Sequence, residues 1–126
     1  MLNNPNVPSW PNFTQEEVNA VSQVLLSNKV NYWTGTEGRD FEQEFASFAG
    51  TAHAIAVANG TVALDLALQG LGIGGRNGGQ DTDEVIVTPR SFLASVSVIV
   101  NAGATPVFAD VDRDSQNISP ATVRSL

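Results

Sequence analysis

Residues 53–112 read HAIAVANGTVALDLALQGLGIGGRNGGQDTDEVIVTPRSFLASVSVIVNAGATPVFADVD, and this stretch decides the fold. Short apolar runs rich in valine, isoleucine and alanine alternate in it with longer runs of helical spacing. The expected strands are residues 54–58, 84–88 and 105–110, and the expected helices between them are residues 61–70 and 91–102. Each helix joins two strands, so we predict two consecutive right-handed βαβ crossovers. The predicted fold class is α/β, a three-layer arrangement in which helices flank a mostly parallel sheet.

The turn between the first strand and the first helix of this stretch is Asn59-Gly60-Thr61. Gly60 lets the backbone approach a ligand closely, and Thr61 offers a hydroxyl and a backbone amide at a helix N-terminus. An α/β protein binds anions such as phosphate at this kind of position. The alternative is a simple strand-to-helix turn in which Asn59 or Thr61 only caps the helix. The turn by itself leaves both interpretations open.

Further polar and aromatic side chains follow the later strands at the same edge of the sheet. Arg90 and Phe92 follow the second strand, where they can face the same crevice as Gly60. An aromatic ring there can lie on a flat cofactor, and an arginine can pair with a carboxylate or phosphate of a substrate. Phe92 can equally belong to the core. Asp110 and Asp112 fit the start of a loop, and we expect no metal site there.

The residues before this stretch are expected to form an arm and two helices. Residues 1–13 are rich in proline and asparagine, so we predict an extended arm. Thr14-Gln15-Glu16-Glu17 is a capping box and begins a helix that continues to about Ser27. A second helix is expected from Glu37 to Ala49. The residues predicted to pack in the core are Phe41, Phe45 and Phe48 of that helix and Leu64, Ala67, Leu68 and Leu71 of helix 61–70.

Composition and charge exclude several classes of protein. The net charge of −7 comes from 13 acidic and 6 basic residues, and no basic cluster is present, so a nucleic-acid partner is not expected. The lack of cysteine excludes disulfides and thiolate metal sites. No apolar run has the length of a membrane span, and the first residues lack the pattern of a signal peptide. We therefore expect a soluble, cytoplasmic protein without membrane contact.

Three other features of the sequence suggest chemistry but have simpler explanations. Gly70–Gly75 matches the dinucleotide-binding pattern G-x-G-x-x-G, but these glycines end a helix, whereas the pattern must open one. The single histidine, His53, precedes the first strand, and we expect it to have a structural role. The single lysine, Lys29, lies in the loop after the first helix, and that position argues against a Schiff-base role.

Several segments occur in a characteristic order and spacing between about Thr14 and Leu126. They are NYWTGTE at 31–37, FEQEF at 41–45, HAIAVANGTVAL at 53–64, DEVIV at 83–87 and GATPVFADVD at 103–112. Together these segments resemble the DegT/StrS family of sugar aminotransferases, which are pyridoxal-phosphate (PLP) enzymes of fold type I. The resemblance implies that residues 1–126 are the N-terminal part of the large PLP-binding domain, and that the C-terminal part of the enzyme lies outside this chain.

The resemblance implies pyridoxal 5'-phosphate as the cofactor and gives a role to the residues of the turn. Gly60 and Thr61, with Asn59 beside them, stand where the family holds the cofactor phosphate. Phe92 stands where the family stacks an aromatic ring on the pyridine ring.

The resemblance also implies which residues meet the substrate. Tyr32, Trp33 and Thr34 match the segment that lines the substrate end of the pocket near the subunit boundary. Arg90 stands where the family has an aromatic or small residue, which suggests a different substrate contact in this protein.

The implied reaction is amino transfer, with glutamate as the plausible donor, to a nucleotide-linked keto-sugar in polysaccharide biosynthesis, by a homodimer with pockets at its interface. The family's Schiff-base lysine belongs to later sequence. This chain alone therefore holds no catalytic residue and is expected to be inactive. Two alternatives stay open. One is a sugar dehydratase of the same family in which histidine replaces the lysine, and the other is a non-catalytic binding or regulatory module that retains only the phosphate turn.

Overall fold

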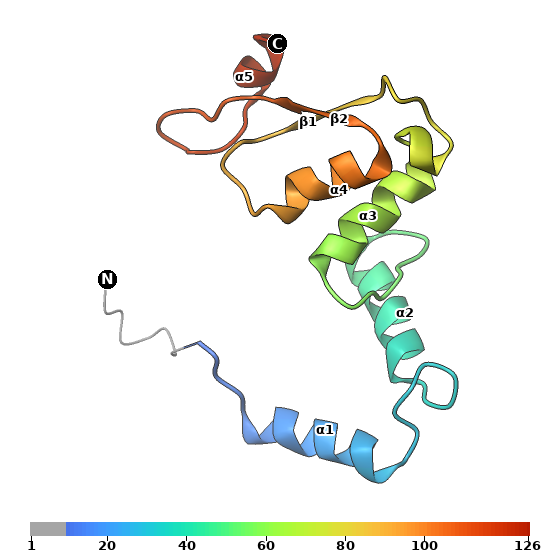
Figure 1. Cartoon of the computed structure of the whole chain (residues 1–126). Helices are drawn as coiled ribbons and strands as arrows, with labels where there is room; N and C mark the ends of the chain where they lie inside the picture. Colours follow the sequence, from blue (N-terminus) through green and yellow to red (C-terminus); the bar gives the residue numbers. More distant parts are fainter. Residues whose placement is uncertain (1–9) are drawn as a thin grey trace. The chain divides into compact units, whose positions relative to one another are not determined.

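The computed structural model describes residues 10–126, and the contacts within it divide the chain into two units (Figure 1). The first unit ends at Ala56 and the second begins at Val57. Most of the expected N-terminal arm, residues 1–9, lies outside the described residues. Residues 10–13, the rest of that arm, are exposed and belong to no helix or strand.

The first unit holds the helices α1 (Gln15–Leu26) and α2 (Glu37–Ala49). The predicted capping box begins α1, because the Thr14 hydroxyl accepts a hydrogen bond from the Glu17 amide while the Glu17 carboxylate accepts one from the Thr14 amide at 2.7 Å. The bonds from the Thr14 amide and hydroxyl lower the pKa of the Glu17 carboxyl, because they stabilise its charged form. α2 has the predicted bounds and ends at Gly50. Both predicted helices of this unit are confirmed.

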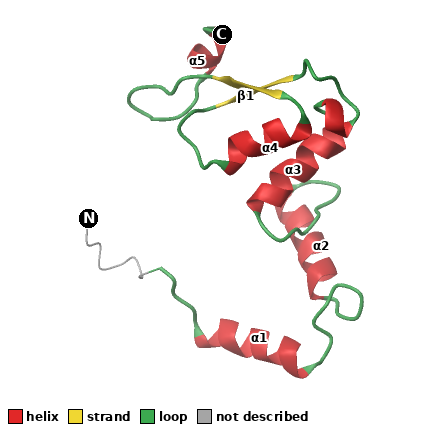
Figure 2. Cartoon of the chain, in the orientation of Figure 1, coloured by secondary structure: helices red, strands yellow, loops and turns green. Residues whose placement is uncertain are grey.

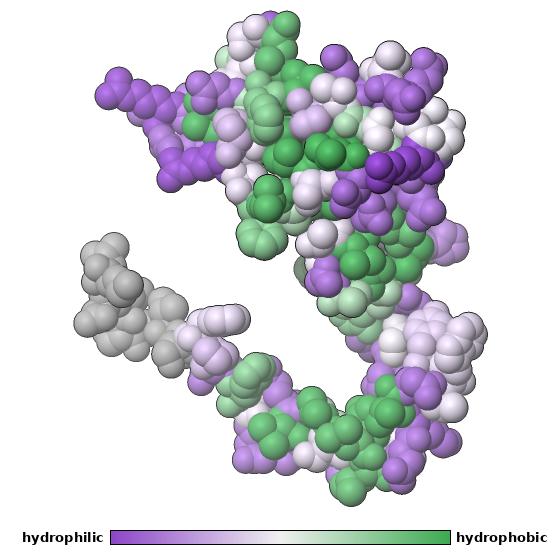
Figure 3. Space-filling model, viewed as in Figure 1, coloured by the Kyte–Doolittle hydropathy of each residue, from purple (hydrophilic) through white to green (hydrophobic). Residues whose placement is uncertain are grey.

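The aromatic stripe of α2 is exposed, so the prediction that it packs in the core is wrong for the described chain. Phe41 and Phe45 are about half exposed, and Phe48 is 88% exposed. Along the helix the rings lie against one another, with centroids 5.7 Å apart for Phe41 and Phe45 and 6.2 Å apart for Phe45 and Phe48. Burial needs an opposing apolar layer, and no other helix of the first unit packs against α2 in the described residues. Most apolar side chains of α1 are likewise exposed, namely those of Val18, Val21, Leu25 and Leu26, and Figure 3 shows hydrophobic surface along that helix.

The second unit contains a parallel strand pair joined by a helix. Its elements are α3 (Gly60–Leu71), the short 3₁₀ helix η1 (Gly75–Asn77), β1 (Glu84–Val87), α4 (Ala94–Ala102), β2 (Thr105–Phe108) and α5 (Pro120–Arg124). β1 and β2 are parallel, with Glu84 opposite Thr105 and Val87 opposite Phe108. Figure 2 shows α4 crossing from the end of one strand to the start of the other. The second of the two predicted βαβ crossovers is therefore confirmed.

The first predicted strand, residues 54–58, is absent from the described structure, which has a sheet of two strands. A strand exists only where its backbone amides and carbonyls find a ladder partner. In this structure the Ala56 amide donates instead to the Glu42 carboxylate at 2.8 Å. The parallel pair β1–β2 and the helices beside it fit the predicted α/β class, but the sheet is smaller than we expected.

The core of the second unit lies between α3, α4 and the strand pair. Its buried residues are Leu68, Val98, Ile99, Ala102 and Ala104, with Ile73, Val85 and Val87 packed against them. Four residues of α3 were predicted to pack in the core. Only Leu68 does so, whereas Leu64, Ala67 and Leu71 are exposed. The reason is the same as for α2, because the described residues cover only one side of the helix.

The loop between α3 and β1 is organised by hydrogen bonds to one carboxylate. The Asp83 side chain accepts from the Gly74 amide at 2.9 Å and from the Gln80 amide at 3.0 Å. These two bonds, the Gly74 bond first, lower the pKa of the Asp83 carboxyl below its usual value, because they favour its charged form. Gly72 caps α3 in the left-handed conformation, with φ of 66°. The glycine-rich stretch therefore ends a helix, as predicted.

Replacing Asp83 with asparagine in the full-length protein is expected to flatten the acid side of its pH–stability profile. A lowered pKa in the folded state adds stability above the unfolded-state pKa of about 4, and this stability is lost as the pH falls through the folded-state value. The wild type is therefore more stable than Asp83→Asn at neutral pH, and the difference shrinks below about pH 4. Urea midpoints across this pH range measure the effect. Asp81→Asn, whose carboxylate has no hydrogen bond within residues 10–126, is the control. A constant difference between wild type and Asp83→Asn would contradict the prediction.

One further property of the helices concerns membranes. Among residues 10–126, no helix is both long enough and apolar enough to cross a bilayer.

Candidate functional site

The turn Asn59-Gly60-Thr61 begins α3 and combines a cap with free hydrogen-bond donors. The Asn59 side-chain oxygen accepts from the Val62 amide at 3.1 Å, and the Asn59 carbonyl accepts from the Ala63 amide at 3.1 Å. The amides of Gly60 and Thr61 and the Thr61 hydroxyl have no hydrogen-bond partner within residues 10–126. The capping interpretation is therefore correct for Asn59, and it leaves the next two residues available to an anion.

A cavity of about 650 Å³ lies over this turn and places Phe92 beside it. The cavity is lined by Asn59, Gly60, Thr61, Ala63, Leu64, Phe92, Ala94 and Ser95. These residues come from the starts of α3 and α4 and from the loop just before α4. The four residues predicted to bind the cofactor therefore share one cavity. Phe92 is 79% exposed, so its ring is available to a flat ligand.

The electrostatics of this cavity favour a negative group near the turn. None of the described side chains that line it carries a formal charge. The N-termini of α3 and α4 both lie at the cavity, and a helix N-terminus carries a partial positive charge from its unpaired amides. The chemistry available here is hydrogen bonding to an anion at the turn and stacking against Phe92.

The predicted substrate residues do not line this cavity. Arg90 lies in the loop between β1 and α4, where its amide donates to the Thr88 hydroxyl at 3.2 Å. Tyr32, Trp33 and Thr34 lie in the first unit, on the loop before α2.

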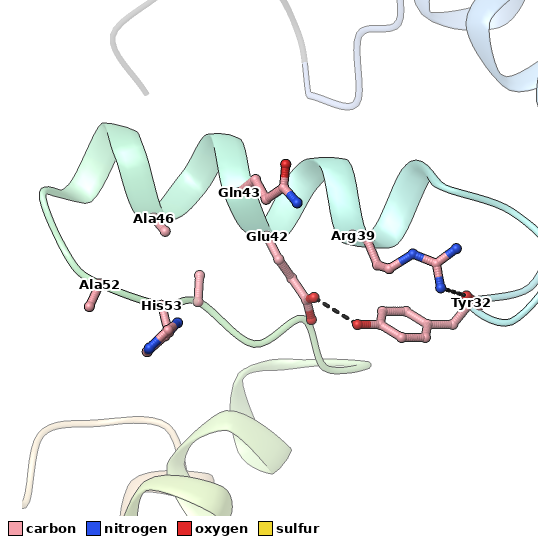
Figure 4. A pocket seen from close by; sticks show the side chains of 8 residues that line it. Tyr32, Arg39, Glu42, Gln43, Ala46, Ala52 and His53 are labelled. Atoms are coloured by element: carbon pink, nitrogen blue, oxygen red, sulfur yellow. Dashed lines mark hydrogen bonds between the residues drawn. The ribbon is translucent and has the colours of Figure 1, made fainter.

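Tyr32 lines a second cavity, of about 290 Å³, within the first unit (Figure 4). The lining residues are Tyr32, Arg39, Glu42, Gln43, Ala46, Ala52, His53 and Ala54. The Tyr32 hydroxyl donates to the Glu42 carboxylate at 3.0 Å, and in Figure 4 the two side chains point toward each other. The pKa of the Tyr32 hydroxyl is raised, mainly by this hydrogen bond, because the carboxylate favours the protonated phenol.

Sequence reasoning missed that Glu42 and His53 share this cavity with Tyr32. Glu42 belongs to the segment FEQEF that carries part of the family resemblance, but the sequence analysis gave this residue no role. His53 was assigned a structural role from its position before an expected strand. Only the fold of the loop places Tyr32 over residues of α2 and of the segment after it, so no local signal could have shown the grouping.

Asp110 and Asp112 begin a loop, as the sequence predicted. The Asp112 carboxylate accepts from the Ser115 amide and hydroxyl, each at 2.9 Å, and from the Asp114 amide at 3.2 Å. These bonds, the Ser115 amide first, lower the pKa of the Asp112 carboxyl. The carboxylate is thus engaged by its own loop.

Replacing Asn59 with alanine in the full-length protein is expected to loosen the first turn of α3. Loss of an asparagine cap costs about 1 kcal/mol, which corresponds to roughly fivefold faster hydrogen exchange at the Val62 amide. Asn59→Ser retains a capping oxygen and serves as the matched control. Equal exchange rates in the wild type and Asn59→Ala would show that the side chain does not cap the helix in solution.

Several known proteins resemble this chain over nearly its whole length. An aminotransferase structure from Psychrobacter cryohalolentis matches with a TM-score of 0.85 and 58% identity, over 94% of this chain and 29% of that protein. The spore coat polysaccharide biosynthesis protein SpsC of Bacillus subtilis (strain 168) is 40% identical over 117 residues, 93% of this chain and 28% of the relative. The 3-amino-5-hydroxybenzoate synthase of Amycolatopsis mediterranei (strain S699) is 39% identical over 119 residues, 94% of this chain and 29% of the relative.

These matches cover nearly all of this chain, which spans less than a third of the length of each relative. The structural relatives have fold type I, in agreement with the predicted fold class. The family model for DegT/DnrJ/EryC1/StrS aminotransferases matches residues 11–126. The chain therefore belongs to the DegT/DnrJ/EryC1/StrS aminotransferase family.

Proposed function

We propose that this chain forms the front part of the large domain of an aminotransferase that moves an amino group, with glutamate as donor, to a nucleotide-linked keto-sugar. The observation that carries the proposal is the cavity in which Asn59, Gly60 and Thr61 lie together with Phe92. The relatives in sugar chemistry, such as the spore coat polysaccharide protein, support a sugar acceptor. The proposed activity, substrates and partners are those of the full-length protein. We also propose that the full-length protein is a homodimer and is located in the cytoplasm.

Aminotransferases of this family depend on PLP, and solved relatives include a PLP form. The residues of the cavity fit this cofactor. The unpaired amides of Gly60 and Thr61 and the Thr61 hydroxyl would hold its phosphate, while Phe92 would lie against its ring. Asn59 would act on the cofactor indirectly, because its side chain shapes the turn by capping α3. Bound PLP supplies the electron sink that amino transfer requires.

On the substrate side we propose roles for Arg90 and for the loop residues Tyr32, Trp33 and Thr34. The guanidinium group of Arg90 can pair with a carboxylate or a phosphate, both of which occur on the proposed donor and acceptor. The Trp33 side chain is 86% exposed, so it is available to stack on a sugar or a base.

The proposal places the lysine that binds the cofactor outside this chain. The single lysine of the chain, Lys29, lies in the first unit and does not line the cavity of the turn. We therefore propose that residues 1–126 alone do not catalyse amino transfer.

The test uses the full-length protein purified with PLP. Incubation with glutamate and a nucleotide-linked keto-sugar should give the amino-sugar and 2-oxoglutarate in equal amounts. Borohydride treatment should add the mass of reduced PLP to one lysine, since only a lysine-bound cofactor is fixed in this way. If the protein binds PLP that borohydride does not fix, and if it dehydrates the sugar, the result would favour the dehydratase. Absence of PLP binding would contradict the cofactor assignment.

A second candidate acceptor follows from the match to 3-amino-5-hydroxybenzoate synthase. That relative is named for an aromatic amine, so the family extends beyond sugars. The candidate is a cyclic keto compound that becomes an aminobenzoate. Turnover of such a compound, with no turnover of keto-sugar nucleotides, would replace the sugar in the proposal and leave the PLP chemistry in place.

A further inference from the structure

We propose that Glu42 is a positioning residue for the acceptor substrate, because its two carboxylate oxygens fasten the loop 31–35 and the backbone at Ala56 to one point on α2. The assignment of the loop 31–35 to the substrate rests on the proposed function. The fastening itself follows from hydrogen bonds within the first unit.

The first connection runs from Glu42 to the loop. The Tyr32 hydroxyl donates to Oε2 of Glu42 at 3.0 Å, across ten residues of sequence. Arg39, one turn earlier on α2, donates to the carbonyls of Tyr32 at 2.9 Å and Gly35 at 2.7 Å, and its guanidinium lies 5.3 Å from the centre of the Tyr32 ring. Two side chains of α2 thus hold the loop, one at its backbone and one at the end of the tyrosine ring.

The second connection runs from Glu42 to the segment after α2. Oε1 of Glu42 accepts from the Ala56 amide at 2.8 Å. Ala56 stands three residues before Asn59 in the sequence, where the turn of the proposed phosphate site begins. An ionised carboxylate can accept hydrogen bonds at both of its oxygens at once, whereas a hydroxyl side chain has a single oxygen. Glu42 therefore joins the predicted substrate loop to the segment that leads to the predicted cofactor turn.

Hydrogen bonds within the loop connect its residues to one another, so the contacts from α2 position the loop as a unit. The Asn31 side-chain oxygen accepts from the amides of Trp33 and Thr34, each at 3.0 Å, and from the Thr34 hydroxyl at 3.1 Å. A side chain at Gly35 would overlap the carbonyl oxygen of Lys29. Because these bonds connect the residues of the loop to one another, the hydrogen bonds made by Glu42 and by Arg39 together set the position of Trp33 and Thr34.

Hydrogen exchange of the full-length protein tests the fastening without any assay of activity. In Glu42→Ala, peptides covering 31–35 and 53–57 should both exchange about tenfold faster, the factor to which ~1.4 kcal/mol corresponds. In Tyr32→Phe, only the peptide covering 31–35 should exchange faster. Glu42→Gln should resemble the wild type, because its amide oxygen can accept from Ala56 while its amide nitrogen donates to the Tyr32 oxygen. Glu44→Ala removes the same charge from an exposed position of α2 and is the matched control.

Steady-state kinetics of the same variants test the link to the substrate. Tyr32→Phe and Glu42→Ala should raise KM for the keto-sugar nucleotide about tenfold and leave kcat within about threefold, and Glu42→Gln should restore KM. Unchanged exchange in Glu42→Ala would overturn the proposal. If Glu42→Ala exchanged faster but remained active with an unchanged KM, the claim that Glu42 positions the substrate would also be overturned. A wild type that exchanges as expected but transfers no amino group would instead overturn the proposed function.

Discussion

Replacing Thr61 with alanine in the full-length protein is expected to weaken PLP binding by about 1–2 kcal/mol, which is roughly a 5- to 30-fold rise in Kd. Thr61 lines the cavity of the turn, and its hydroxyl has no hydrogen-bond partner within residues 10–126. We propose that it binds the cofactor phosphate; a typical hydrogen bond contributes about 0.5–1.5 kcal/mol and one to a charged group about 1.5–3 kcal/mol, and the expected loss lies within this span. Titration of the apoprotein with PLP, followed by the absorbance of the bound cofactor, measures the change.

Thr61→Ser is the matched control, because it keeps the hydroxyl and should keep the affinity. The urea midpoint of the Thr61→Ala apoprotein should equal that of the wild type, since the hydroxyl makes no hydrogen bond within the described chain. This separates a loss of binding from a loss of folding. Equal PLP affinity in Thr61→Ala and the wild type would remove the phosphate assignment.

Replacing Gly74 with alanine is expected to destabilise the folded protein by about 3 kcal/mol. Gly74 has φ of 88° and ψ of 148°, a backbone conformation that is essentially restricted to glycine. A Cβ atom at this position would also overlap the carbonyl oxygen of Ala102, at the end of α4. The residue cannot move away freely, because its amide donates to Asp83. Urea unfolding of the full-length protein measures the loss.

Gly78→Ala is a comparison at a second glycine of positive φ, in a left-handed conformation and with open space around it. Gly78 has φ of 89°, but a Cβ atom there would meet no atom of the described chain within 4 Å. Only the cost of a left-handed backbone remains, about 1–2 kcal/mol. If Gly74→Ala and Gly78→Ala destabilised the protein equally, the packing of the loop against α4 would not matter in solution.

The sequence predicted well those features that depend on neighbouring residues. The bounds of α2, the capping box at Thr14 and the cap at Asn59 are determined by residues within four positions of each other. The sequence also predicted that Phe92 lies near the turn, and one cavity contains both, although the strand 54–58 on which that prediction relied is absent from the described residues.

The sequence failed where an element needs a distant partner. Residues 54–58 have the composition of a buried strand, yet no described strand pairs with them. The stripe of Phe41, Phe45 and Phe48 has the spacing of a core face, yet no described layer covers it. Propensity and periodicity state what a segment prefers, but the partner decides whether the preference is realised.

The grouping of Tyr32, Glu42 and His53 could not be predicted for a different reason. It depends on the path of the loop 28–36, which has no periodicity to read. The hydrogen bonds that the Asn31 side-chain oxygen accepts and that the Arg39 guanidinium donates set that path, and their geometry appears only in three dimensions.

The internal bonding of the loop 31–35 has a consequence for how this protein can diverge from its relatives. Asn31 and Arg39 hold the backbone of the loop, whereas the Trp33 side chain takes no part in that bonding and is largely exposed. A loop that its own bonds preorganise loses little conformational entropy when a ligand arrives. Position 33 can thus exchange one side chain for another while the scaffold that presents it stays intact. A substitution at this position would remove the edge-to-face contact with Tyr32 but none of the hydrogen bonds that hold the loop.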